Sequence, residues 1–299
     1  MPFVSVIVPN YNHAAFLKQR IDSILNQSFQ DFELILLDDC STDGSRAVLN
    51  SYAENPHVSH VVFNKSNSGS PFAQWQKGIS LAKGEWIWIA ESDDWADEYF
   101  LETMLIEAKA YPTAGLLYAK AKYMYPDGKT WCPQLSNRIV FHRGEDFLKQ
   151  RLLFNNVIYN VSMVLFRKSL IKDLDFAKFD NMRLCGDWFF YTLLCERTDV
   201  LEVDKLLSYY RVHNANSSYV AECEGRTFLE GIEILDYILA CHLMSPRVYS
   251  RRWGRQLAKY QIKYHYSEGV RNMILRCLRR NHKLMLLYYY IYRLKNALK

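Results

Sequence analysis

Short apolar runs alternate with helical spacings over the first 90 residues of the chain. The apolar runs predict strands, and the segments between them, where apolar residues recur every three or four positions, predict helices. The expected strands cover residues 3–8, 31–37, 58–63 and 85–90, and the expected helices cover residues 14–27, 46–54 and 72–82. Pro9 is expected to stop the first strand. Because these elements alternate with short connections, the pattern predicts right-handed crossovers and a parallel sheet.

Beyond residue 90 the pattern is less regular. The expected elements are two strands, at 114–124 and 203–211, and two helices, at 143–154 and 188–196. From about Glu224 the chain is helical in character, and Pro246 is expected to separate two helices. We therefore expect an α/β domain over residues 1–222 and a helical extension over residues 223–299.

Three carboxylates, those of Glu91, Asp93 and Asp94, follow the fourth expected strand. They repel one another and cannot all be buried without partners. A cation is therefore expected beside them, and the simplest candidate is Mn²⁺ or Mg²⁺, which carboxylates commonly bind together with substrate phosphates. The other interpretation is a solvated acidic turn that caps the next helix.

Polar residues follow each of the first four expected strands, where ligands bind in open α/β sheets. The clusters are residues 9–12, residues 38–39, residues 64 and 67–69, and residues 91–94. Four clusters in succession indicate a nucleotide-sized site. Tyr11 can stack on a base and Asp39 can accept a hydrogen bond from a base N–H; alternatively, Tyr11 is a rim aromatic and Asp39 a helix cap.

Glycine-rich phosphate cradles are missing from the sequence. It contains neither G-x-x-x-x-G-K-[ST] nor G-x-G-x-x-G after a strand. A diphosphate bound at this site therefore needs a metal to neutralise it, and the acidic cluster at residues 91–94 can hold one.

Five segments, in this order and spacing, resemble the inverting family 2 glycosyltransferases. They are residues 4–12 (VSVIVPNYN), 34–45 (LILLDDCSTDGS), 67–69 (NSG), 82–85 (AKGE) and 91–94 (ESDD). The resemblance extends over residues 3–215. It implies a GT-A fold, which is a Rossmann-like, mostly parallel sheet flanked by helices, and transfer of a sugar from a nucleotide-sugar donor with a metal bound at a DxD motif.

The resemblance also implies roles for single residues. Pro9, Tyr11, Asn12 and Asp39 would hold the base and ribose, and Asp93 and Asp94 the metal and diphosphate. The other candidates for donor binding are Asn67, Gly69, Gln74, Lys77 and Arg211, and the other candidates for metal binding are Glu91 and His213.

Three features depart from the family pattern. Glu91 stands where the first Asp of DxD is usual, and its longer carboxylate can still ligate. Ala73-Gln74-Trp75 replaces the usual Ala-Arg-Asn, so Gln74 or Lys77 is expected to make the contact of the missing arginine. The Q-x-x-R-W signature of processive synthases is absent, which indicates addition of one or a few sugars.

The catalytic base is expected on the acceptor side. Residues 185–188 (CGDW) resemble the family element whose aspartate, here Asp187, takes the proton from the acceptor hydroxyl. In-line displacement at the anomeric carbon needs such a carboxylate opposite the leaving diphosphate. Alternatively, Asp187 is an N-cap or first-turn acid, and a helix N-terminus is expected to keep the pKa of Asp187 low.

A later segment, residues 210–213 (YRVH), resembles the part of the family that closes over the diphosphate. Arg211 would supply a fixed positive charge there. His213 would ligate the metal or donate to a phosphate.

Charge divides the chain into an acidic body and a basic tail. Residues 244–299 hold fourteen Lys or Arg and one acid, Glu268, so the tail carries +13 and the remainder −8. The seven cysteines form no CxxC pair, which argues against a zinc site and a disulfide framework. The start lacks a signal-peptide pattern and no apolar run reaches 18 residues, so a cytoplasmic protein is expected.

The basic tail predicts a surface for interaction. Residues 284–292 are apolar or aromatic and have basic neighbours. They are too few to cross a bilayer and suit an interfacial helix on the anionic inner face of the cytoplasmic membrane. The alternatives are a helical layer packed on the body or a dimer contact; nucleic-acid binding is not expected, because the body is acidic and no such motif occurs.

These observations favour an inverting, metal-dependent glycosyltransferase with a UDP-linked donor and a glycan or lipid-linked acceptor. The expected setting is the assembly of a bacterial surface polysaccharide, such as capsule, lipopolysaccharide or a similar glycan. A nucleotidyltransferase is one alternative, although residues 10–13 (NYNH) lack the Gly-rich, basic signature that usually follows its first strand. A non-catalytic scaffold is the other.

Overall fold

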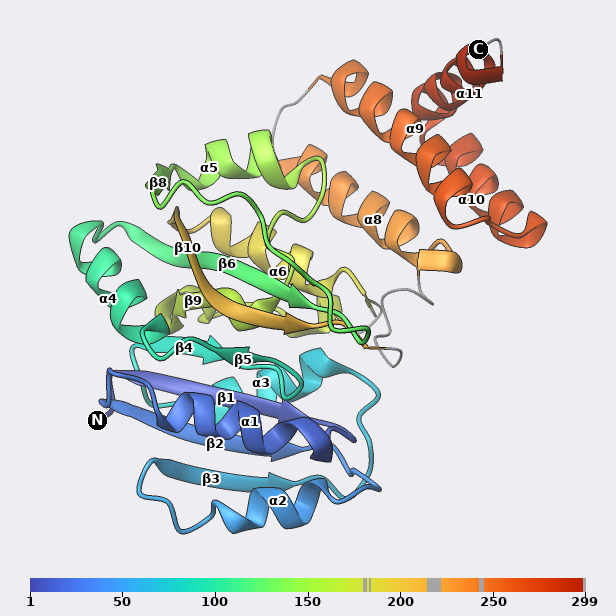
Figure 1. The fold of residues 1–299 in the computed structure, drawn as a ribbon. Helices are drawn as coiled ribbons and strands as arrows, with labels where there is room; N and C mark the ends of the chain where they lie inside the picture. The colour runs from blue at the N-terminus through green and yellow to red at the C-terminus, as the bar shows by residue number, and fades with distance from the viewer. Residues whose placement is uncertain (180–181, 183, 214–221, 242–244, 298–299) are drawn as a thin grey trace. The chain divides into compact units, whose positions relative to one another are not determined.

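The computed structural model describes residues 1–179, 182, 184–213, 222–241 and 245–297 (Figure 1). The chain divides into two compact units. The first comprises Met1–Phe147, Ile158–Asn181 and Leu193–His213, and the second comprises Leu148–Val157, Met182–Thr192 and Asn214–Lys299. The domain boundary at residue 222 stays a prediction.

A mixed sheet forms the centre of the first unit. Its described strands are β1 (Val4–Asn10), β2 (Phe32–Asp38), β3 (Val58–Phe63), β4 (Trp86–Ile89), β5 (Trp95–Ala96), β6 (Ala114–Met124), β7 (Thr130–Trp131), β8 (Ile139–His142), β9 (Val164–Arg167) and β10 (Asp199–Arg211). The order is β3-β2-β1-β4-β9-β6-β10-β5, with β7 beside β6 and β8 beside β10. The first four strands are parallel where they pair, as expected, whereas β9 runs antiparallel to both β4 and β6.

Helices cover both faces of this sheet. They are α1 (Ala14–Leu25), α2 (Ser45–Ser51), α3 (Pro71–Leu81) and α4 (Phe100–Ala110). Val4, Val6 and Val8 of β1 join a buried cluster with residues of α1, α2 and α4. Ile7 points to the other face and meets α3 at Gly78, where an added Cβ would lie 2.3 Å from Ile7 Cγ2. The glycine therefore lets α3 lie close against β1.

Two expectations about element ends are wrong. Pro9 does not stop the first strand, because β1 continues to Asn10 and Pro9 pairs in register with Leu37. Proline has no backbone N–H to donate to a neighbouring strand. The loss is small here, because β4 pairs with β1 only as far as Ile7. The expected helix over 143–154 is a short α5 (Gly144–Phe147) followed by a π-helical turn (Leu148–Leu152).

The second unit is mainly helical. Its described helices include α8 (Arg226–Cys241), α9 (Pro246–Lys263), α10 (Glu268–Asn281) and α11 (Lys283–Ala297). Pro246 begins α9, which confirms the expected break. The indoles of Trp188 and Trp253 stack with ring centroids 5.9 Å apart, and each donates to a backbone carbonyl, Trp188 to Leu152 (2.9 Å) and Trp253 to Leu153 (3.2 Å). Within the described ranges, no helix has the length and apolarity needed to cross a bilayer.

Candidate functional site

Asp39 lies buried at the carboxyl end of β2 and is surrounded by donors. Its carboxylate accepts hydrogen bonds from Ser68 N (2.9 Å), Ser68 Oγ (2.7 Å), Asn64 Nδ2 (2.6 Å) and Gln74 Nε2 (2.9 Å). Asn67 Nδ2 donates to the Asp39 carbonyl (3.1 Å), and Lys77 Nζ donates to Asn64 Oδ1 (2.5 Å). The expected donor-binding residues around Asp39 therefore lie close together. The hydrogen bonds that the Asp39 carboxylate accepts all come from the protein itself.

Backbone geometry shapes the loops beside this network. Gly69 has φ +71°, and its N–H donates to Asn67 Oδ1 (2.6 Å). Asn12 also has a positive φ, +57°, and its Oδ1 accepts from Thr42 N (2.8 Å). The turn after β1 is thus fastened to the turn after β2. Pro9 is buried within β1, whereas Tyr11, which directly follows this strand, is 46% exposed.

Two carboxylates of the acidic turn are held by protein donors. Asp94 Oδ2 accepts from Asn160 Nδ2 (2.7 Å) and Ser162 Oγ (2.8 Å), and its Oδ1 accepts from Arg211 N (3.0 Å). Burial, together with the nearby charge of Asp93, raises the pKa of Asp94 to about 7.

Glu91 is the second of these carboxylates. Its Oε1 accepts from Trp75 Nε1 (3.0 Å). Burial, with the charge of Asp93, raises the pKa of Glu91 to about 8. The structure does not bring Glu91 or Asp94 into the metal-binding group that follows.

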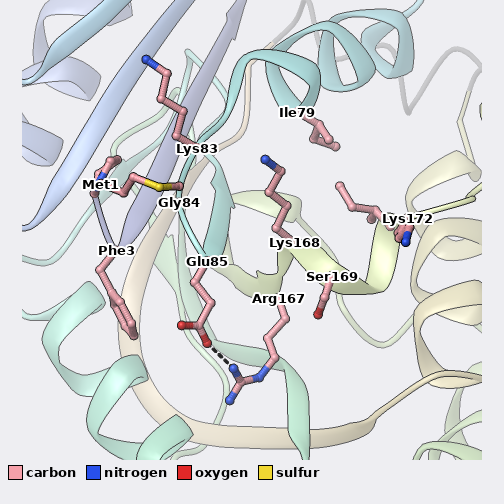
Figure 2. A pocket seen from close by; sticks show the side chains of 12 residues that line it. Met1, Phe3, Ile79, Lys83, Gly84, Glu85, Arg167, Lys168, Ser169 and Lys172 are labelled. Atoms are coloured by element: carbon pink, nitrogen blue, oxygen red, sulfur yellow. Dashed lines mark hydrogen bonds and ion pairs between the residues drawn. The ribbon is translucent and has the colours of Figure 1, made fainter.

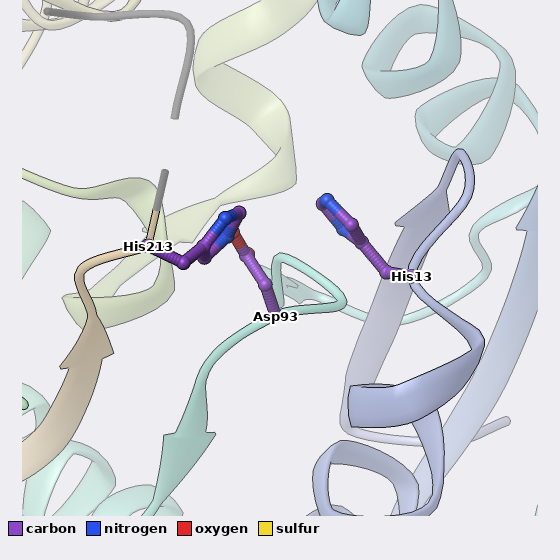
Figure 3. Close-up of side chains that lie close together, drawn as sticks. All are labelled: His13, Asp93 and His213. Carbon is purple, nitrogen blue, oxygen red and sulfur yellow. The ribbon is translucent and has the colours of Figure 1, made fainter. Parts of the chain in front are cut away.

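Asp93 differs from its two neighbours because it faces histidines (Figure 3). Its Oδ2 lies 2.9 Å from His213 Nε2, and the rings of His213 and His13 meet edge to face at 5.6 Å. One ligand atom from each of the three residues lies within 4.8 Å of the others. Burial alone would raise the pKa of Asp93, but the hydrogen bond with His213, and the positive charge that His13 carries when protonated, hold this pKa below its usual value.

This group suits a divalent metal. Nδ1 of His13 lies 2.8 Å from Ser92 Oγ, so Nε2 is the ring nitrogen that would bind the metal. Burial lowers the pKa of His13, which favours the neutral imidazole that metals bind. Two imidazoles and one carboxylate suit Mn²⁺ better than Mg²⁺, because Mg²⁺ prefers oxygen ligands. Sequence reasoning missed His13, although it directly follows the polar cluster after β1.

Arg211 joins β10 to the acidic turn. Its Nε donates to the Asp93 carbonyl (2.9 Å) and its NH2 to Gln19 Oε1 (2.6 Å). The guanidinium carbon lies 4.5 Å from the ring centroid of Phe16 and 4.8 Å from that of Trp95. These contacts hold the charge of Arg211 beside Asp93, and its expected contact with the donor diphosphate stays a prediction.

A buried arginine also lies near the three carboxylates. Arg20 of α1 is fully buried, with its guanidinium 5.0 Å from the ring centroid of Trp88. Within the described residues, none of its side-chain nitrogens has a hydrogen-bond partner. Burial lowers the pKa of Arg20 to about 10, although the charges of Asp94 and Asp93 oppose this shift, so it remains a cation at neutral pH. Arg20 thus supplies part of the positive charge that the acidic turn requires.

Asp187 belongs to the second unit, in the first turn of α6 (Gly186–Cys195). Its carboxylate accepts from Asn156 Nδ2 (2.9 Å) and from Trp188 N (2.6 Å). Glu230 of α8 fastens the preceding loop by accepting from Cys185 N (2.7 Å). The expectation of a low pKa is wrong: burial outweighs these hydrogen bonds and raises the pKa of Asp187 to about 7.

A surface pocket of about 740 Å³ lies at the opposite end of the strands (Figure 2). It is lined by residues that precede β1 and β4, such as Phe3 and Gly84, and by Arg167 at the end of β9. Arg167 pairs with Glu85, which also lines the pocket. Because ligands of open α/β sheets bind at the carboxyl ends of the strands, we do not assign this pocket to the site.

Residues 5–175 match the family model described as glycosyl transferase family 2, and this match covers more than half of the chain. The chain belongs to glycosyl transferase family 2. This family 2 chain is similar to a Bacillus subtilis glycosyltransferase named for teichuronic acid biosynthesis, with 34% identity over 46% of this chain and 59% of that protein. It is also similar to glycosyltransferase GlyG of Streptococcus pneumoniae, with 30% identity over 52% of this chain and 48% of that protein. The chain spans about half the length of the curated relatives it matches.

Solved structures share the fold of this family 2 chain. S. aureus TarS in complex with UDP-GlcNAc aligns with a TM-score of 0.62 and 18% identity over 99% of this chain and 92% of that one. The mannosyltransferase PcManGT of Pyrobaculum calidifontis, in complex with GDP-Man and Mn²⁺, aligns with a TM-score of 0.57 and 16% identity over 99% of this chain and 87% of that one. The likeness confirms the expected GT-A fold and its helical C-terminal region.

Proposed function

We propose that this protein is an inverting glycosyltransferase that moves a sugar from a UDP-linked donor to a hydroxyl of a glycan or lipid-linked acceptor in bacterial surface polysaccharide assembly. The observation that carries the proposal is the group formed by Asp93, His13 and His213 at the carboxyl ends of parallel strands in a family 2 chain. The UDP and UDP-GlcNAc complexes of TarS support the choice of donor, and the relative named for teichuronic acid biosynthesis supports the setting.

The donor would lie along the edge where the turns after β1, β2 and β4 meet. Tyr11 is exposed enough to stack on the base. For Asp39 to accept from a base N–H, one of its present donors has to give way. Arg211 supplies positive charge next to Asp93. When bound, Mn²⁺ would neutralise the donor diphosphate and the charge that develops as it leaves.

We propose that Asp187 is the general base that takes the proton from the acceptor hydroxyl. Inversion in one displacement needs a base that takes the proton as the acceptor oxygen attacks, and a carboxylate with a pKa near 7 suits that task at neutral pH. Asn156 and the backbone N–H of Trp188 fix the orientation of this carboxylate.

Hydrolysis of a panel of nucleotide sugars tests the function. We expect one or more UDP-sugars to be hydrolysed with Mn²⁺, EDTA to abolish the activity, and Mn²⁺ to restore it better than Mg²⁺ because two of the three proposed ligands are imidazoles. The measurement is release of UDP from each donor, with each metal added back in turn.

Other results would favour the alternatives. Silence with every donor, together with no nucleotide-induced thermal shift, would indicate a scaffold. Pyrophosphate release from a nucleoside triphosphate and a sugar phosphate would indicate a nucleotidyltransferase.

A further inference from the structure

Helix α11 carries an apolar stripe that faces solvent. Leu287, Tyr290, Ile291 and Leu294 are exposed by 53%, 41%, 38% and 64%. Their spacing of three, one and three residues places them on one face of the helix. A surface helix normally packs such a stripe against the core. An apolar stripe that stays exposed therefore indicates a surface for interaction.

The opposite face of α11 is already covered. Helix α11 lies beside α9 (Figure 1), and its residues Met285 and Tyr289 are buried. Gly254 of α9 allows the close approach of the two helices. A Cβ at Gly254 would lie 2.5 Å from Met285 O and 2.8 Å from Tyr289 N. The Tyr289 hydroxyl donates to Gln261 Oε1 (2.5 Å), which fixes the rotation of the helix. The stripe is therefore a second apolar face held outward.

Basic residues lie along α11 and on its neighbouring helices. Lys283 lies one turn before Leu287 on the same face, and Lys295 follows Leu294. On the neighbouring helices, Arg255 of α9 lies 5.4 Å from the ring centroid of Tyr292. The exposed cations of α10 are Arg276, Arg279 and Arg280. Glu268 is the one acid in residues 244–299, whose net charge is +13.

We propose that this stripe of Leu287, Tyr290, Ile291 and Leu294 docks on an anionic lipid leaflet. At about 1.5 Å per residue, the fifteen residues of α11 are shorter than the hydrocarbon core of a bilayer, so the helix lies in the interface with its basic flanks among acidic headgroups. The charge argues against a second copy of this chain as the occupant, because two tails of +13 repel each other. The surface is independent of the reaction; its use in reaching a lipid-linked acceptor rests on the proposed function.

Vesicle sedimentation of the full chain tests this surface. We expect binding to vesicles with roughly a third of anionic lipid, little binding to neutral vesicles, and weakening at about 0.5 M salt. Leu294→Glu should lower the binding about tenfold or more, because it places a charge in the apolar stripe. Ile106→Glu is the matched control: Ile106 is 60% exposed on α4, and this change should leave binding within about twofold.

Two results would overturn the proposal. One is equal vesicle binding by the Leu294→Glu and Ile106→Glu proteins. The other is a lipid-free dimer that Leu294→Glu converts to a monomer, which would assign the stripe to a second copy. Donor hydrolysis is measured without vesicles on the same proteins, so a failure of the proposed function shows there and leaves the vesicle result unchanged.

Discussion

Replacing Asp93 with asparagine is expected to reduce donor turnover by roughly three orders of magnitude, the equivalent of about 4 kcal/mol of lost charge stabilisation. Asp93 is the one carboxylate of the acidic turn that meets His13 and His213, so its loss removes the anionic ligand of the proposed site. Calorimetric titration with Mn²⁺ should show a large loss of affinity. The thermal stability of the metal-free protein should change little.

Asp94→Asn is the matched comparison. Three donors bind the carboxylate oxygens of Asp94. Asparagine replaces one of these oxygens with an NH₂ group, so at least one donor loses its acceptor, which costs about 2 kcal/mol of folding free energy. We expect denaturant unfolding to report that loss, while Mn²⁺ still binds. If Asp94→Asn lost the metal and Asp93→Asn kept it, the assignment of ligands would be reversed.

Asp187→Asn is expected to lower kcat by about 10²–10⁴-fold, the usual contribution of a general base. An asparagine keeps the shape of the side chain and cannot take a proton, so UDP affinity should stay unchanged. Steady-state kinetics together with UDP titration separates these two effects. Glu268→Gln, which changes an exposed first-turn acid of α10, serves as the control and should leave kcat unaltered.

The pH profile of the native protein sharpens this test. A base must be deprotonated to act, and the pKa of Asp187 is raised to about 7, chiefly by burial. Activity should therefore fall as pH drops through about 7, rather than near 4 as for an ordinary carboxylate. The acidic limb should disappear from the residual activity of Asp187→Asn. A limb that survives in the variant would belong to another group.

The regular part of the fold could be predicted because local pattern and tertiary placement agree there. β1 to β4 are apolar runs that pair in parallel. The expected span of β3 equals the observed one, and the ends of the other three differ by one or two residues. The four-residue β9 carries too little pattern to be recognised, and its place between β4 and β6 depends on distant pairings. α4 was missed although Phe100, Met104 and Ala108 have helical spacing.

The site was harder to predict, because its chemistry depends on tertiary partners. In the sequence Glu91, Asp93 and Asp94 look equivalent, and only Trp75, Ser162 and the histidines separate them. His13 could have been found from its position after β1. The burial of Arg20 could also have been predicted, because it is a charged residue on the apolar face of α1, one turn before Ile24.

Anomalous diffraction from a crystal grown with Mn²⁺ and UDP tests the central claim most directly. The account predicts one manganese peak bonded to Asp93, His13 and His213, with the UDP diphosphate on its open side and the base beside Tyr11. A peak on Glu91 and Asp94 that leaves both histidines unbound, or UDP bound away from the carboxyl ends of β1 to β4, would contradict it.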